Sequence, residues 1–112
     1  MGRGAKAKKG SKPKPKVLAS FEGDFPEIWK AYGWLRDACD HEGPLDPKTR
    51  ELIKIGVETT RGGHGGMVAH IHRAERAGAS REEILQAILL AGPLAGFPAV
   101  LDAYLVAKKH LG

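Results

Sequence analysis

The sequence predicts a small all-α protein, a compact and oligomeric bundle of about five helices. In several stretches apolar residues recur at three- and four-residue spacing, which is the period of an amphipathic helix. Glycine and proline cluster between these stretches, and no stretch alternates apolar and polar residues as a half-buried strand does. The 112 residues suffice for one domain.

The first part of the chain differs in composition from the rest. Residues 1–16 are a basic tail with seven lysine and arginine residues and no acid, so the domain over residues 17–112 is mildly acidic although the net charge is +5. Because the tail has almost nothing apolar to bury, we expect it to be disordered. It contains no aromatic residue that could stack on bases, which favours a solvated tail over a nucleic-acid-binding arm.

The first two helices are predicted by periodicity and by a cap. Residues 25–39 carry one apolar face, made of Phe25, Ile28, Trp29, Tyr32 and Leu35. Cys39 is expected to be a core residue of this helix. Asp46 then offers an N-cap and Pro47 suits the first helical position, which predicts a second helix from there to about residue 60.

The last three helices are separated by glycine and proline. A third helix over residues 66–77 follows a glycine-rich break and ends before Gly78. Ser80 and Glu83 form a capping box for a fourth, which ends at the next Gly-Pro pair. A fifth runs over residues 97–109. The last two helices carry more apolar residues than a lone bundle of this size needs, which predicts association between copies.

The sequence also indicates in which cellular compartment the protein is expected. No apolar run approaches the ~18 residues of a membrane-spanning helix, and no apolar segment follows the basic N-terminus as in a secretory signal. The single cysteine excludes an intrachain disulfide and is typical of a reducing compartment. We therefore expect a cytoplasmic protein that binds no membrane, and no motif calls for a cofactor.

His70 is the most informative candidate site residue. Its helix has an apolar face made of Met67, Ile71, Ala74 and Ala77. His70 lies beside that face and should point inward or into a cleft. On the preceding helix Glu51, Lys54 and Glu58 share a polar stripe, and a glutamate from it can meet His70 if the two helices pack antiparallel. Such a pair suits proton transfer, but a satisfied core histidine beside a solvated stripe fits the same pattern.

The glycine-rich break is a second candidate site. Its residues Gly63, His64, Gly65 and Gly66 precede a helix. Bare amide N–H groups at such a position suit a substrate anion, whereas a flexible turn is the alternative. A metal site is not expected, because His70 and His72 are two residues apart and diverge on a helix, unlike ligand pairs four residues apart.

Residues 45–105 resemble the carboxymuconolactone decarboxylase and alkylhydroperoxidase D-like family. The matching text is LDPKTRELIKIGVETT, followed by MVAHIHRAERAGASREEILQAILLAGPLAGFPAVLDAY. Its most specific parts are the run from His70 through Gly-Ala-Ser-x-Glu-Glu-Ile and the later Ala-Gly-Phe-Pro-Ala. The resemblance implies an all-helical, alkylhydroperoxidase D-like fold that assembles as a homotrimer or homohexamer.

The resemblance also bears on chemistry. In the peroxidase branch a Glu is followed by Cys-x-x-Cys and a His, and matching that His to His70 places the Glu at Glu51 and the thiols at Gly63 and Gly66. Glycine cannot replace a thiolate nucleophile. The decarboxylase branch lacks the cysteines and removes CO₂ from a carboxylated lactone.

The resemblance therefore favours a lyase acting on a small carboxylated lactone or a related anionic carbonyl compound. In this interpretation His70 is the general acid/base, Glu51 orients it, and Glu58 is a second candidate carboxylate. A peroxidase relative and a non-catalytic oligomeric binding protein are the alternatives.

Overall fold

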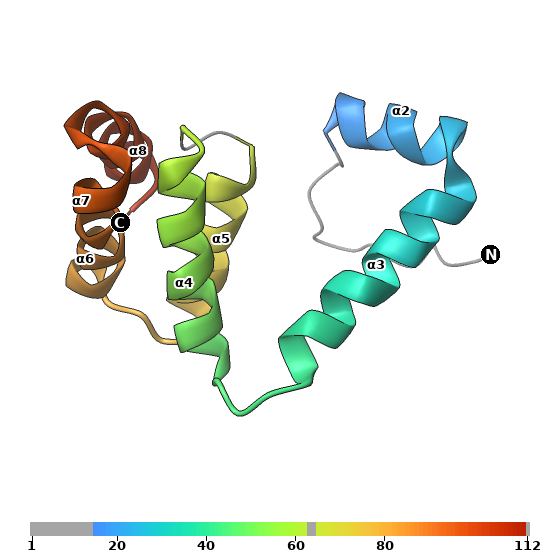
Figure 1. The fold of residues 1–112 in the computed structure, drawn as a ribbon, viewed down its shortest axis with the longest axis horizontal. Helices are drawn as coiled ribbons and strands as arrows, with labels where there is room; N and C mark the ends of the chain where they lie inside the picture. The colour runs from blue at the N-terminus through green and yellow to red at the C-terminus, as the bar shows by residue number, and fades with distance from the viewer. Residues whose placement is uncertain (1–14, 63–64, 112) are drawn as a thin grey trace. The chain divides into compact units, whose positions relative to one another are not determined.

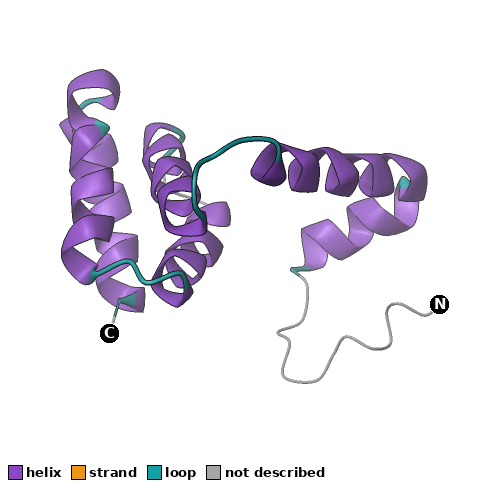
Figure 2. Cartoon of the chain, turned by 90° about the horizontal axis from the view of Figure 1, so that it is seen from below, coloured by secondary structure: helices purple, strands orange, loops and turns teal. Residues whose placement is uncertain are grey.

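A computed structural model describes residues 15–62 and 65–111, and over these residues the chain is helical with no strand (Figure 2). The elements are α2 (Lys16–Asp24), α3 (Pro26–His41), α4 (Pro47–Thr60), α5 (Gly66–Arg76), α6 (Arg81–Leu90), α7 (Gly92–Ala95) and α8 (Phe97–His110). The predicted all-α class is confirmed. The predicted disorder of the tail concerns mainly residues 1–14, which lie outside the described part of the chain.

The chain divides into two compact units, Met1–Gly43 and Pro44–Gly112. In the first unit α2 and α3 are joined at Phe25, whose ring lies 5.2 Å from that of Phe21. Helix α2 was not predicted. Its apolar residues Val17, Leu18 and Phe21 lie on one side at helical spacing, but the pattern spans little more than one turn.

The expectation that Cys39 is a core residue is wrong. Cys39 is exposed, and no described residue of the first unit is buried. Two helices joined at Phe25 enclose too little volume to bury a side chain from all directions, so an apolar face on α3 does not by itself create a core.

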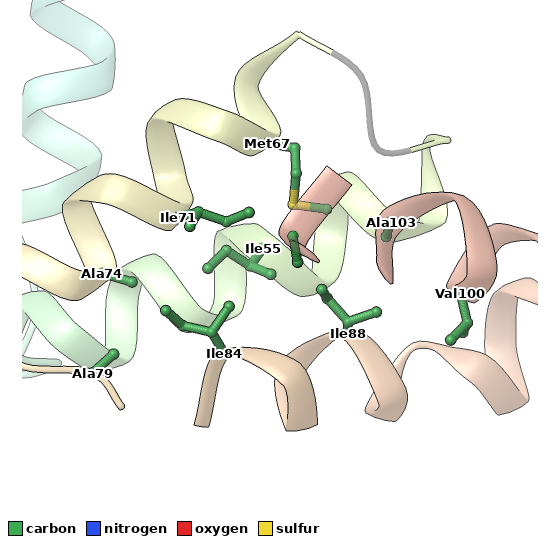
Figure 3. Close-up of a cluster of buried hydrophobic side chains, with 10 residues drawn as sticks. Ile55, Met67, Ile71, Ala74, Ala79, Ile84, Ile88, Val100 and Ala103 are labelled. Carbon is green, nitrogen blue, oxygen red and sulfur yellow. The ribbon is translucent and has the colours of Figure 1, made fainter. Parts of the chain in front are cut away.

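The second unit contains the core of the described chain. Helices α4 and α5 lie side by side, and α6, α7 and α8 pack against this pair (Figure 1). The buried cluster takes residues from α4, α5, α6 and α8, and Ala79 from the connection between α5 and α6 (Figure 3). Its members are Ile55, Met67, Ile71, Ala74, Ala79, Ile84, Ile88, Val100, Ala103 and Ala107. This core determines which faces of α4 and α5 meet.

The helix boundaries follow the predicted caps closely. The Asp46 carboxylate accepts a hydrogen bond from the Thr49 amide at 2.8 Å. Both hydrogen bonds of the predicted capping box between Ser80 and Glu83 are present. The predicted interruption at Gly92 is in fact a separate short helix, α7, because Pro93 is tolerated in a first helical turn, where its missing N–H costs nothing.

Several large apolar side chains of α6, α7 and α8 lie on the surface of the single chain. They are Leu89, Leu90, Leu94, Phe97, Leu101, Tyr104 and Leu105. None of the helices in the described ranges is long and apolar enough to span a membrane.

Candidate functional site

Helix α4 presents one buried stripe that contains a carboxylate. Glu51, Ile55 and Thr59 recur every four residues and are all buried. The Asp46 cap and Pro47 start the helix so that this stripe faces the core. Thr59 satisfies its hydroxyl locally by donating to the Ile55 carbonyl at 2.9 Å. The Lys54 ammonium of the same helix lies 3.8 Å from the Glu51 carboxylate, beyond hydrogen-bond distance, so this buried carboxylate takes its hydrogen-bond donor from another helix.

Helix α5 supplies that donor. Met67, Ile71 and Ala74 are fully buried, and His70 lies at the margin of their face with its side chain 16% exposed. The inward position that the apolar face predicted for His70 is therefore observed. Close packing of α4 against α5 brings the imidazole to the Glu51 carboxylate although 19 residues separate them in sequence.

The two side chains form a short hydrogen bond. Nδ1 of His70 and Oε1 of Glu51 are 2.7 Å apart, and the Glu51 side chain is 11% exposed. An ionised carboxylate can only accept, so Nδ1 carries the proton and donates it, and Nε2 remains for exchange with another group. The Lys54 ammonium, 3.8 Å from the other Glu51 oxygen, offsets part of the negative charge. This is the arrangement of an oriented acid–base imidazole.

Glu58 reaches the same region from the last turns of α4. Its side chain is 14% exposed, and its Oε2 lies 3.8 Å from the Arg61 guanidinium, whose side chain is 70% exposed. Glu58 Oε2 also lies beside Gly66, the first residue of α5. The second candidate carboxylate is therefore close to the site, but the hydrogen-bond partner of Nδ1 is Glu51.

The glycine-rich turn is described only in part. Gly63 and His64 lie outside the described residues. Gly62 and Gly65 have φ of +96° and +54°, a left-handed region that favours glycine, so the turn requires glycine at both positions. The Glu58 carboxylate beside Gly66 means that an anion at this end of α5 would meet a negative group as well as amide donors.

An apolar groove on another face of α4 is separate from the His70 site. It has a volume of about 500 Å³. Leu52, Ile53, Gly56, Val57 and Thr60 of α4 line it, with Glu83, Gln86, Ala87, Leu90, Ala91 and Leu94 from the segment of α6 and α7. Neither Glu51 nor His70 contributes to it, so the groove is not the place of the acid–base pair.

Two features of the site were not recognised in the sequence. Arg61 lies three residues after Glu58, a spacing at which opposite charges meet on a helix and which would have suggested this pair. The close approach of Glu58 to Gly66 had no sequence signal. Over residues 15–62 and 65–111, histidine, cysteine and acidic side chains form no group suited to a metal ion.

The carboxymuconolactone decarboxylase family matches residues 23–109, which include both helices of the acid–base pair. No curated protein matches the sequence.

Proposed function

Because the chain belongs to the carboxymuconolactone decarboxylase family, we propose that it is a lyase that removes CO₂ from a small carboxylated lactone or a related anionic carbonyl compound. The observation that carries this proposal is the 2.7 Å hydrogen bond between His70 and Glu51 at the edge of the core. His70 is the general acid/base and Glu51 is the group that orients it.

The proposed step is a balanced proton transfer. When the carboxylate leaves as CO₂, the electron pair of the broken carbon–carbon bond is delocalised into the conjugated carbonyl as an enolate. Protonated His70 donates its Nε2 proton to that carbon and later regains one from water. One proton is consumed for each CO₂ released. The hydrogen bond to Glu51 holds Nδ1 protonated throughout, so that Nε2 is the nitrogen that exchanges.

A thiol-dependent peroxidase is disfavoured by the position of the only cysteine. Cys39 is in the first unit, on α3, and the residues that match the peroxidase thiols are glycines. We expect no dithiol peroxidase turnover with hydroperoxides under any reductant. Peroxide reduction by the wild type that disappears in Cys39→Ser would contradict this expectation.

The lyase proposal is tested by CO₂ release from a panel of carboxylated lactones and β-keto acids. His70→Gln keeps polarity and approximate volume, and it should lower kcat at least about 10²-fold because general acid–base catalysis is lost. Glu51→Gln should also lower kcat, because an amide does not fix the imidazole in the same way. The matched control is His72→Gln, which changes a histidine on the same helix that faces Glu75.

The control variant should retain wild-type activity. No CO₂ release from any member of the panel, with the lactones still binding to the wild type, would favour the alternative of a non-catalytic binding protein. Release that is unchanged in His70→Gln would show that the chemistry takes place elsewhere.

A further inference from the structure

The groove along α4 offers mainly apolar contact. On the α4 side it extends from Leu52 to Thr60, which is about 12 Å at the rise of an α-helix. The Thr60 hydroxyl already donates to the Val57 carbonyl. The Glu83 carboxylate already accepts from Lys48. The groove therefore suits an occupant with an apolar face about two helical turns long.

Helix α3 carries an apolar stripe of this length. Ile28, Tyr32 and Leu35 lie at positions i, i+4 and i+7, and their side chains are 57%, 55% and 52% exposed. They span about 10 Å along the helix. No described residue of the first unit is buried, so the described part of that unit does not cover the stripe. This is the spacing of the anchors with which an amphipathic helix binds in an apolar groove.

The charges of the two segments are complementary. Residues 17–43, which follow the basic tail and include all of α3, hold six acidic and two basic residues, a net charge of −4. Residues 44–112 hold seven acidic and nine basic residues, a net charge of +2. Contact between two like segments would bring like charges together, whereas contact of an α3 with a groove joins opposite ones. Such complementarity selects which surfaces meet, and the apolar area supplies the affinity.

We propose that the groove of each copy binds the apolar stripe of α3 from a neighbouring copy of this chain. In the single chain both the stripe and the groove are open to solvent, so each has its partner on another copy. Every copy then gives one stripe and receives one, which makes the contact heterologous. A heterologous contact that closes produces a ring with no stripe or groove left free. The proposal concerns assembly and does not depend on the lyase function.

The first test changes one surface at a time. Leu90→Glu places a charge in the groove, and Ile28→Glu places one in the stripe. Both side chains are more than half exposed in the single chain, so the core should stay intact, which thermal unfolding followed by circular dichroism checks. Light scattering should report each variant alone as a monomer. An equimolar mixture should form a heterodimer, because the intact α3 of one variant enters the intact groove of the other.

The matched control is Trp34→Glu, which changes a 73% exposed apolar side chain of α3 that lies off the stripe, and it should keep the wild-type mass. Assembly that persists in Leu90→Glu would show that α3 stripes pair with each other. Assembly that persists in Ile28→Glu would show that grooves pair with each other. Either result would overturn the proposal, as would a monomeric wild type or a mixture that stays monomeric.

The second test uses the only cysteine of the chain. Cys39 is exposed and lies four residues after Leu35, on the continuation of the stripe. Gln86→Cys adds a second thiol at the groove. A short thiol-to-thiol cross-linker should then join copies into covalent multimers, and adding Cys39→Ser should abolish them. Multimers that persist with Cys39→Ser, or that form in the wild type, would show contact between like surfaces and overturn the proposal.

Discussion

Single side chains on α4 show how one buried stripe serves both the core and the site. Ile55 and Thr59 need nothing beyond packing and a local hydrogen bond, whereas Glu51 needs the imidazole of another helix. Removing His70 without replacing its hydrogen bond would leave a buried carboxylate poorly paired, which is costly. Glutamine is therefore a better substitute at position 70 than alanine for separating activity from stability.

The residue-scale prediction concerns Ile55, which is fully buried at the centre of the cluster (Figure 3). Ile55→Ala should lower the free energy of unfolding by about 2–5 kcal/mol, because it removes buried apolar atoms and leaves a cavity. Urea denaturation measures the loss. Ile53→Ala is the matched control two residues away, where the side chain is 50% exposed, and its loss should be smaller. Equal losses would show that Ile55 does not hold the central place described.

At the scale of helices, hydrogen bonds cap the starts of α4 and α6 and also connect the two starts to each other. The Ser80 backbone N–H donates to Glu83 at the start of α6, and the Lys48 ammonium of α4 donates to the same carboxylate at 3.1 Å. These two hydrogen bonds lower the pKa of Glu83 from its ordinary value of 4.5, with the backbone donor as the larger cause. The Glu83 carboxylate thus caps the start of α6 and also connects α6 to α4.

The pKa shift of Glu83 makes part of the stability pH-dependent. Because the folded-state pKa is lowered, the stabilisation is present above pH 4.5 and is lost as the pH falls through the folded-state value. Glu83→Gln should therefore destabilise the protein at neutral pH, and its difference from the wild type should shrink below pH 4.5. Thermal denaturation over a pH series measures this.

Glu82→Gln is the control for this prediction, because it removes the same charge from the same first turn of α6. Its effect should be smaller at neutral pH. A Glu83→Gln variant as stable as the wild type at pH 7 would contradict the role given to the capping box.

At the scale of the whole molecule, the described chain leaves much apolar surface exposed. The first unit has no buried residue among those described, and the large apolar side chains of α6, α7 and α8 lie mostly on the surface. Large contiguous apolar patches are rare on monomeric proteins and mark surfaces of association. We propose that the protein works as a homotrimer or homohexamer, as its resemblance to alkylhydroperoxidase D-like proteins implies.

Light scattering should therefore report a trimer or a multiple of it at micromolar concentration. The assembly should persist in high salt, because burial of apolar area is not screened by ions. Leu94→Glu should weaken it by placing a charge on the exposed apolar side of α7. Lys109→Glu, a charge change near the end of α8, is the control and should leave the assembly intact. A monodisperse monomer would refute the proposal.

The sequence alone determined the helical class and most helix boundaries, because both depend on interactions within a few residues. Apolar spacing, the Asp46 cap and the capping box at Ser80 all act inside one or two turns. The same helical spacing predicted that His70 lies at the edge of an apolar face. The composition showed that the chain has no second cysteine for dithiol chemistry.

Only the tertiary structure decided between the two glutamates. Glu51 and Glu58 lie on one stripe of α4, and apart from the family resemblance, which points to Glu51, nothing in their spacing says which of them meets an imidazole 19 or 12 residues further along the chain. That choice depends on how α4 packs against α5, which the whole core sets. The exposure of Cys39 and the approach of Glu58 to Gly66 were hidden for the same reason: each depends on which residues from distant parts of the chain fill, or leave empty, the space around a side chain.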